Sequence, residues 1–480
     1  MIEGKLLEFL KDKSIIILGY GREGESTYKF IRKNFPDKKI EIVDENVKIL
    51  ELKPYLNDDK NIEFNLSNEY FRDIDKYDIV VKTPGISFKD YDISGFRDKI
   101  YSQLELLLEF IPCKTIGITG TKGKSTTSSM LYKVLKDQGL DTLLLGNIGE
   151  PYFNDLDKMS EDTILVLELS SHALEFVRKS PNISILLNIF QEHLDHHNKI
   201  DEYIAAKFNI AKYQGKNDYF IYNATNEYMT EFINKMIIDE ENIIKENDIA
   251  ILGNISKEDK DKCKKIKEDI VNGKFKNYIH MIDHTVYLNN DILCDKKINT
   301  KLKGNHNINN MLFIFAVAKI LNLDFKKVLK SFKEFEPLEH RLEYVDTINE
   351  ISYYNDSIST IPEATIAAIK ALKNVNTVIV GGTDRGISLD ILYSFLKKNK
   401  KVENIICLPK TGEYIYEALK NSNKKLIMVK NVEEAVIEAS KITKKGEICL
   451  LSPSSASYGF YKNFEERGKV FKESVNNLKK

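Results

Sequence analysis

Short apolar runs alternate with amphipathic stretches along most of the chain, which is the pattern of parallel strands connected by helices. The runs that we expect to form strands fall into three groups: 14–18, 39–43 and 78–82; 115–118, 163–169 and 182–189; and 350–354, 377–380 and 447–451. The clearest amphipathic stretches run up to residue 33, over 126–140 and over 200–214. Because the alternation restarts near residues 112 and 337, the sequence predicts an α/β protein with three domains, at 1–112, 113–336 and 337–480.

One part of the middle domain departs from this pattern. Residues 223–301 are rich in lysine, acidic residues and asparagine, with short strand-like pieces at 250–252 and 285–288. We expect a solvated segment there and find no legible chemistry in it. The next stretch, 304–310, opens a helix at 311–321 that we predict to be strongly amphipathic; its asparagines fit helix caps and could equally contact the edge of a base.

Glycine, lysine and serine cluster where the first strand of the middle domain meets its helix, in the run from Gly120 to Thr126. Such a turn directs backbone N–H groups and a helix N-terminus at one point, where Lys124 adds a positive charge and Ser125 a hydroxyl that suits magnesium. Ile118 stands where the standard P-loop pattern has its first glycine, so this loop has a shorter form. We predict a site for the phosphates of a nucleotide.

The first domain carries a second glycine-rich turn, Gly19-Tyr20-Gly21-Arg22-Glu23-Gly24. Asp44, at the end of the next strand, completes the dinucleotide fingerprint with an acidic residue for a ribose. The turn fits other diphosphate-bearing nucleotides equally well, and a dehydrogenase would leave the phosphate loop without a role. The loop at 83–87 follows the third strand, at the edge where open α/β sheets bind ligands.

Two side chains in the middle domain, Glu168 and His193, are candidates for a metal site, and a third, Lys207, is notable for its surroundings. Glu168 ends a buried strand, and beside a phosphate loop a magnesium ion is a better partner for it than a lysine or a helix N-terminus. The segment 190–197 holds three histidines whose spacing matches no zinc pattern, so we select His193, nearest to the strand end. The apolar neighbours of Lys207 indicate that this lysine points inward.

Each predicted strand of the last domain stops at polar residues, at 355–357, 381–386 and 452–457. Because the carboxyl ends of parallel strands meet at one edge of a sheet, we expect these loops to form a binding rim. Taken singly, each loop is equally well explained as a capped turn.

The composition narrows the choice of partners. The 480 residues include 71 basic and 72 acidic side chains, so no global field favours nucleic acid or an anionic membrane. The five cysteines form no C-x-x-C pair and are expected to be reduced thiols. No signal peptide is legible, and no apolar run reaches the roughly 20 residues that span a bilayer. We expect a soluble, cytoplasmic monomer with small-molecule ligands, without membrane insertion.

Taken in order, the motifs resemble those of the Mur ligases, the ATP-dependent amino-acid ligases of peptidoglycan synthesis, and among them the branch that adds D-glutamate. The resemblance covers nearly the whole chain. Its most specific pieces are 120–126, 146–149, 167–171, 187–195, 203–207, 306–307, 340–341, 355–357 and 451–464.

The resemblance implies a fold and a reaction. The fold is an N-terminal Rossmann-like domain, a central parallel sheet of the P-loop ATPase type and a C-terminal Rossmann-like domain. In the reaction, ATP phosphorylates the free carboxylate of UDP-N-acetylmuramoyl-L-alanine, and the amine of glutamate then displaces the phosphate. The cofactors are ATP and two magnesium ions.

The resemblance also implies roles for individual residues. ATP is expected at Gly120, Thr121, Lys122, Gly123, Lys124, Ser125, Thr126, Asn307, Asn310, Arg341 and Asp356. The UDP-linked substrate is expected at Gly19, Gly21, Gly24, Asp44, Thr83, Pro84, Gly85 and Asn147. Glutamate is expected at Arg385, Ser457 and Phe464. The expected catalytic residues are Lys124, Glu168, His193 and Lys207, with one magnesium ion on Ser125 and Glu168 and a second on His193 and carbamylated Lys207.

The chain departs from the D-glutamate-adding branch at one position. That branch has Asn-Asp-Ser-Lys-Ala-Thr at the positions of residues 355–360, and here Ile358 replaces the lysine that is expected to pair with a glutamate carboxylate. Either another cation takes that role, with Arg385 as the candidate, or the amino acid differs. D-glutamate is our prediction and L-glutamate the leading alternative.

Two functions of other kinds remain to be compared. A folylpolyglutamate synthetase shares the phosphate loop and the ligase chemistry, but its relatives lack a separate N-terminal nucleotide domain. A non-catalytic subunit would be marked by loss of the four expected catalytic residues, and all four are present.

Overall fold

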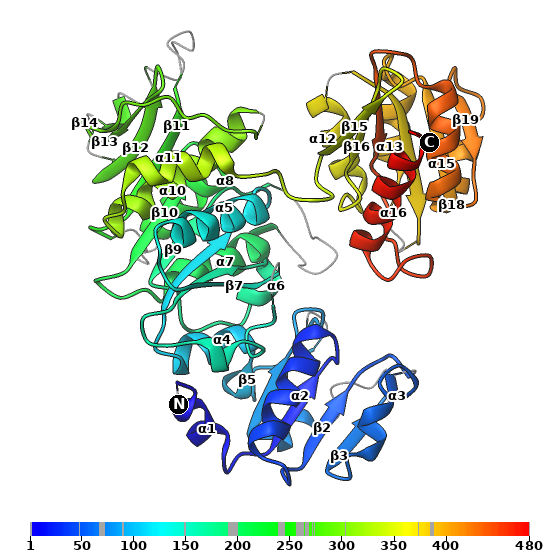
Figure 1. Cartoon of the computed structure of the whole chain (residues 1–480). Coiled ribbons are helices and arrows are strands. Elements are labelled where there is room, and N and C mark those ends of the chain that lie inside the picture. The colour runs from blue at the N-terminus through cyan, green and yellow to red at the C-terminus, as the bar shows by residue number, and fades with distance from the viewer. Residues whose placement is uncertain are drawn as a thin grey trace. The chain divides into compact units, whose positions relative to one another are not determined.

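Figure 1 shows the chain as a computed structural model, which describes residues 2–47, 49–66, 73–88, 91–147, 150–190, 200–238, 245–255, 264, 268–270, 272, 274–302, 304–372, 374–384 and 388–479. The chain divides into two compact units, Met1–Phe335 and Glu336–Lys480. The first unit contains two β-sheets and the second contains one. Within these described ranges, no helix is both long enough and apolar enough to cross a membrane.

The first sheet is parallel throughout, with strand order β3-β2-β1-β4-β5. Its strands are β1 Ile15–Leu18, β2 Ile40–Val43, β3 Ile62–Asn65, β4 Ile79–Lys82 and β5 Ile100–Tyr101. The helices are α1 Gly4–Leu10, α2 Arg22–Asn34, α3 Ile49–Leu52 and α4 Gln103–Phe110, with short 3-10 turns η1 Pro54–Asp58, η2 Ile74–Lys76 and η3 Arg97–Lys99. The strand order reverses between β1 and β4, so the ends of these two strands flank the crevice where such sheets bind ligands.

The second sheet has nine strands in the order β14-β13-β12-β11-β10-β9-β6-β8-β7. The strands are β6 Lys114–Thr119, β7 Thr142–Gly146, β8 Ile164–Glu168, β9 Ile183–Leu186, β10 Tyr219–Asn223, β11 Ile249–Asn254, β12 Asn277–Ile282, β13 Thr285–Leu288 and β14 Asp291–Cys294. The helices are α5 Lys124–Asp137, η4 Leu156–Lys158, α6 Ser171–Leu174, α7 Ile200–Lys212, α8 Glu227–Ile238, α10 Asn305–Ile320 and α11 Phe325–Glu334. Because β6 lies between β8 and β9, the phosphate loop that follows β6 has both neighbouring strand ends beside it.

Two expectations for this sheet were wrong. The segment 223–301 is not simply solvated, because β11 to β14 extend the sheet and bury apolar side chains such as Ile251, Ile279 and Val286. Helix α10 is not amphipathic, because every residue from Met311 to Ala318 is buried. An unbroken apolar run of this kind marks a helix that is covered on all sides. Its early asparagines lie inside the helix, whose N-cap is Gly304, and so are not caps.

The sheet of the second unit has the order β15-β16-β20-β17-β18-β19, parallel except for the β15–β16 hairpin. Its strands are β15 Glu343–Ile348, β16 Ile351–Asn355, β17 Val375–Gly382, β18 Asn404–Lys410, β19 Lys425–Met428 and β20 Ile448–Leu451. Its helices are α12 Pro362–Leu372, α13 Asp390–Lys398, α14 Thr411–Leu419, α15 Val432–Ile442 and α16 Phe464–Asn477. The prediction that three strands end at one edge is confirmed, because β16, β20 and β17 are adjacent and parallel.

Candidate functional site

The phosphate loop has the backbone that its glycines predict. Gly120 has φ 153° and Gly123 has φ 89°, and both values lie in the region that favours glycine. A Cβ on Gly120 would lie 3.2 Å from the backbone nitrogen of Asn188, and one on Gly123 would lie 3.1 Å from the amide nitrogen of Asn310. A side chain at either position would therefore strain the backbone and press on a neighbour, and Asn310 of α10 lies beside the loop as predicted.

Asn188, which the sequence analysis did not select, fixes the conformation of this loop. Its side-chain oxygen accepts a hydrogen bond from the backbone N–H of Lys122 at 2.8 Å, and its amide nitrogen donates to the backbone oxygen of Lys122 at 2.8 Å. Its own backbone oxygen accepts from the N–H of Thr121 at 2.8 Å. Since Asn188 comes two residues after β9, its place at the end of a strand next to β6 was the available signal.

Two lysines converge on one carbonyl oxygen of the loop. The Nζ of Lys124 donates to the backbone oxygen of Gly120 at 2.9 Å, and the Nζ of Lys207 donates to the same oxygen at 3.1 Å. Lys207 is only 1% exposed, which confirms that it points inward. The two nitrogens are no more than about 6 Å apart, close enough for like charges to disfavour each other. An anion bound at the loop would relieve that repulsion.

Ser125 and Glu168 meet behind the loop, as predicted. The hydroxyl of Ser125 donates to one oxygen of the Glu168 carboxylate at 3.1 Å, and the hydroxyl of Ser128 donates to the other at 3.3 Å. The side-chain amide of Asn147 also donates to Glu168, at 3.2 Å. Glu168 is 1% exposed, and hydroxyl and amide groups donate its side-chain hydrogen bonds in the described part of the chain. A hydroxyl and a carboxylate are the hard oxygen ligands that magnesium prefers, so the residues present fit that ion.

The other residues that we expect at the ATP and metal sites lie on several elements. Thr121 and Thr126 are buried, and the hydroxyl of Thr121 is 2.8 Å from that of Tyr203, a residue of α7 that the sequence analysis did not select. Asn307 lies in the first turn of α10, with 9% of its surface exposed. His193 lies outside the described residues. Within those residues no three histidine, cysteine or acidic side chains form a metal-binding group.

The glycine-rich turn of the first sheet connects β1 to α2, at the point where the strand order reverses. Gly19 has φ 87°, and a Cβ there would lie 2.2 Å from the hydroxyl oxygen of Thr83. A Cβ on Gly24 would lie 2.0 Å from the backbone oxygen of Gly19. Gly21 has neither constraint, since its φ is −74° and a Cβ would meet nothing within 4 Å. Its missing side chain leaves the start of α2 open to a ligand, as a diphosphate site requires.

Asp44 and the loop after β4 lie at the same end of the first sheet. Asp44 accepts hydrogen bonds from the backbone N–H of Tyr20 at 2.6 Å and of Asn46 at 2.8 Å. Thr83 donates its hydroxyl hydrogen to the backbone oxygen of Leu18 at 2.9 Å. Pro84 and Gly85 follow it, and a Cβ on Gly85 would meet nothing within 4 Å. The turn, the acid and this loop are thus brought together as predicted.

In the second unit, Arg341 and Asp356 lie close together. Asp356 is 2% exposed and accepts hydrogen bonds from the Leu342 N–H at 3.2 Å and the Ser452 hydroxyl at 2.8 Å. Burial raises the pKa of its carboxyl to about 6, although Arg341 and these hydrogen bonds oppose the change. The Nε of Arg341 is buried and has no hydrogen-bond partner within the described part of the chain. Such an orphaned donor is typical of a place where a ligand binds.

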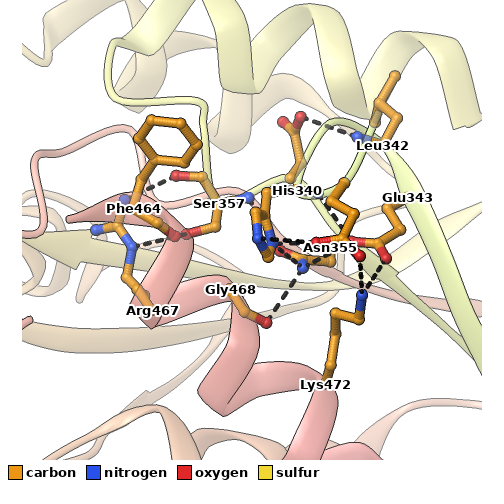
Figure 2. A network of polar contacts seen from close by, with 11 residues as sticks. His340, Leu342, Glu343, Asn355, Ser357, Phe464, Arg467, Gly468 and Lys472 are labelled. Carbon is orange, nitrogen blue, oxygen red and sulfur yellow. Dashed lines mark hydrogen bonds and ion pairs between the residues drawn. The ribbon is translucent and has the colours of Figure 1, made fainter. Parts of the chain in front are cut away.

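Two of the residues expected to hold the amino acid, Ser457 and Phe464, lie around the rim formed by the ends of β16, β17 and β20. Ser457 follows β20 and is 3% exposed, and the ring of Phe464, at the start of α16, lies edge-on to that of His340 at 6.3 Å. Figure 2 shows Phe464 near Ser357, whose hydroxyl donates to the Phe464 backbone oxygen at 2.8 Å. Ile358 is half-buried beside them, and Arg385 lies outside the described residues.

Comparison with known proteins gives consistent results. Residues 118–318 match the family model described as the Mur ligase middle domain, and residues 340–455 match the one described as the Mur ligase, glutamate ligase domain. The chain is 32% identical over 486 residues to a protein of Clostridium kluyveri named UDP-N-acetylmuramoylalanine--D-glutamate ligase, covering 98% of each. It is also 32% identical over 490 residues to a protein of the same name from Clostridium botulinum strain Langeland, covering 99% of each.

Solved structures share the fold. The UDP-N-acetylmuramate-alanine ligase MurC of Thermotoga maritima superimposes with a TM-score of 0.56 at 18% identity, covering 97% of this chain and 100% of that one. The MurF ligase of Thermotoga maritima, solved in complex with ADP, gives a TM-score of 0.54 at 14% identity, covering 92% of this chain and 96% of that one.

Proposed function

The chain belongs to the Mur ligase family, and we propose that it is the ATP-dependent ligase that joins D-glutamate to UDP-N-acetylmuramoyl-L-alanine in peptidoglycan precursor synthesis. Support comes from relatives of that name, which match it over nearly their whole length. The observation that carries the proposal is that Lys124 and Lys207 both donate to the same backbone oxygen of the phosphate loop. Ser125, the residue after Lys124, donates in turn to Glu168.

The reaction needs activation because a carboxylate is a poor electrophile. In the first step, the terminal phosphoryl group of ATP is transferred to the free carboxylate of the alanyl group, giving an acyl phosphate and ADP. In the second, the glutamate amine attacks the carbonyl carbon, the bond to the phosphate oxygen breaks, and the amine proton is lost. Phosphoryl transfer depends chiefly on positioning and charge neutralisation, which Lys124 and the N–H groups of the loop provide.

Magnesium is the expected cofactor and neutralises charge on the phosphate oxygens when bound. Ser125 and Glu168 would hold one ion, and their hydroxyl and carboxylate suit it. His193 and a carbamylated Lys207 would hold a second. Carbamylation converts a lysine ammonium into an anion, which would remove the like-charge contact with Lys124.

We assign binding sites to the other substrates from the chemistry of the residues that would line them. The open Gly21 turn, Asp44 and the loop at Thr83 would hold the UDP group, and Asn147 would lie on the muramoyl side. Arg341 and Asp356 would complete the nucleotide site, while Arg385, Ser457 and Phe464 would hold glutamate. The domains at 1–112, 113–336 and 337–480 would thus bind chiefly the UDP-linked substrate, ATP and glutamate, respectively. We expect a cytoplasmic monomer.

Phosphate release from ATP tests the proposal. The assay contains UDP-N-acetylmuramoyl-L-alanine with D-glutamate, with L-glutamate or with no amino acid. We expect release with D-glutamate and little without an amino acid. Release with neither enantiomer would contradict the ligase assignment.

L-glutamate is a second candidate because of one residue. Ile358 stands where the D-glutamate-adding branch has a lysine, so the amino-acid site lacks that cation. Release with L-glutamate alone would establish this alternative in the same assay.

A further inference from the structure

Arg467 is the largest side chain in the interior of the second unit. It lies in the first turns of α16 and is only 1% exposed. Its Nε donates to the hydroxyl of Ser357 at 3.1 Å and its Nη2 to the backbone oxygen of Ser357 at 2.8 Å. Its Nη1 donates to the backbone oxygens of Ser455 at 3.0 Å and Ala456 at 3.2 Å. One guanidinium therefore ties α16 to the loops after β16 and β20. Figure 2 shows Arg467 beside Ser357.

The same guanidinium reaches the third loop indirectly. The backbone oxygen of Ala456 also accepts from the N–H of Thr383, at 2.9 Å, in the loop after β17. A Cβ on Gly382 would lie 2.4 Å from that oxygen and 3.2 Å from the Nη1 of Arg467. The glycine is needed because Arg467 and the loop fill the space. Arg467 thus contacts the loops after β16 and β20 directly, and it is linked to the loop after β17 through Ala456.

The charge of Arg467 is not balanced nearby. In the part of the chain that the structure describes, it makes no ion pair, and its hydrogen bonds go to backbone oxygens and one hydroxyl. Burial lowers the pKa of its guanidinium to about 10, so it remains a cation at neutral pH. A buried charge normally has a partner of opposite sign, because desolvation is costly. The guanidinium therefore places a positive charge just below the surface of the rim.

The rim also contains a polar group without a partner. Ser454, in the loop after β20, has a left-handed φ of 58°, and its buried hydroxyl has no hydrogen-bond partner among the described residues. Ser454 directly precedes Ser455, whose backbone oxygen accepts from Arg467. A strained residue with an orphaned hydroxyl at this position indicates a place where a ligand supplies the missing contacts.

We propose that Arg467 is a positioning residue for the second substrate: it holds the three strand-end loops in their binding conformation, and its unbalanced charge favours an amino acid that carries carboxylates. This inference rests on the proposed ligase function. Arg467 is too deeply buried to be a catalytic residue, so its effect should be confined to the step in which the amino acid takes part.

The two half-reactions separate the alternatives. Hydroxylamine is a small neutral nucleophile that can intercept the acyl phosphate: its nitrogen bonds to the carbonyl carbon, phosphate leaves, and a hydroxamate forms. Hydroxamate formation from ATP and UDP-N-acetylmuramoyl-L-alanine therefore reports the first step without the amino acid. If the wild-type enzyme forms no hydroxamate and releases no phosphate, the proposed function itself fails.

Arg467→Met tests the inference directly. We expect KM for glutamate to rise at least about tenfold while hydroxamate formation stays within about twofold of wild type, because only the amino-acid site loses its shape and charge. Arg467→Lys retains the positive charge but lacks the planar guanidinium group. Its KM for glutamate should therefore lie between that of the wild type and that of Arg467→Met. Lys472→Met is the matched control, since Lys472 lies on the same helix, is bonded to Glu343 at 2.5 Å, and should leave KM unchanged.

A purely structural role gives a different result. In that case hydroxamate formation and glutamate use would fall together in the Met variant, and the inference would be overturned. If the Met variant does not fold, the Lys variant decides the question by the same two measurements. An unchanged KM in a folded variant would also overturn it.

Discussion

The phosphate loop of the first unit and the strand-end rim of the second both lie at the carboxyl edge of a parallel sheet, but their positive charges are placed differently. Lys124 is the first residue of α5, directly after the loop, and it contacts the carbonyl oxygen of Gly120 four residues earlier. Arg467 belongs to a helix and contacts Ser357, a residue 110 positions earlier in the chain. Lys124 is half-buried, whereas Arg467 is only 1% exposed.

The difference shows how each site is encoded. A charge that must approach a phosphate needs a tight turn, and glycines with positive φ at residues 120 and 123 mark that turn within one short motif. A charge that must hold several loops together needs partners from all of them, which only the folded sheet brings near. Damage to the first site should therefore remove chemistry, whereas damage to the second should change affinity or stability.

The largest effect is expected from Lys124→Ala. Loss of this charge removes a contact that neutralises the transferring phosphoryl group, so kcat for both hydroxamate formation and ligation should fall about 10³-fold. Lys133→Ala is the control, because Lys133 lies on the same helix but pairs with Asp137 at 2.9 Å, away from the loop. Equal losses in the two variants would show that the helix, not the charge at the loop, determines activity.

Lys207→Ala should have the next largest effect. If carbamylated Lys207 supplies an anionic metal ligand, its removal should lower kcat about 10²-fold, and short carboxylic acids such as acetate should restore part of the activity by filling the vacated space. Lys212→Ala, an exposed position on the same helix, should show neither loss nor rescue. Full activity of Lys207→Ala would contradict the proposed ligand.

Much of the first site could be predicted from sequence because its chemistry follows strand ends. Lys124, Ser125 and Glu168 are adjacent to a loop or end a strand of strong apolar character, and the structure brings them together as expected. Asn188 was missed because an asparagine after a strand resembles any turn residue until the neighbouring strand is known. Its role depends on a contact across 66 residues.

Arg467 was missed for a related reason. An arginine in a helix is usually solvated, and nothing near it in sequence shows a partner. The spacing of Arg467 could have indicated its burial, because Arg467, Phe471 and Val475 lie four residues apart on the buried face of α16. The buried α10 shows the opposite error, since an unbroken apolar run was taken to have a polar face.

Gly468→Ala sharpens the view that the second site depends on packing. In a helix this change normally stabilises by roughly 1 kcal/mol. Here the new Cβ would lie 2.2 Å from the Nδ1 of His340, whose ring is held by a 2.8 Å contact with the amide of Asn355 (Figure 2). We expect a net loss of about 1–3 kcal/mol in stability, measured by chemical unfolding of the full chain. His340→Ala combined with Gly468→Ala should be no less stable than His340→Ala alone.

The smallest expected effect is a pH dependence at the same rim. Burial raises the pKa of Asp356 to about 6 in the folded chain, whereas an unfolded aspartate has a pKa of about 3.9. Between these values the folded state binds a proton that the unfolded state does not, so this stabilising contribution is complete below about pH 4 and is lost as the pH rises through 6. Lowering the pH from 7 to 5 should therefore stabilise β16 and β20 by about 1 kcal/mol.

Hydrogen exchange of the full chain, corrected for intrinsic rates, measures this change in peptides from the two strands. Asp356→Asn is the matched variant, because its amide oxygen can still accept from the Leu342 N–H, its amide nitrogen can donate to the hydroxyl oxygen of Ser452, and the side chain cannot titrate. The difference in protection between pH 5 and pH 7 should then disappear. If the Asn variant keeps the wild-type pH dependence, the titrating group is elsewhere, and burial at this rim does not hold Asp356 protonated.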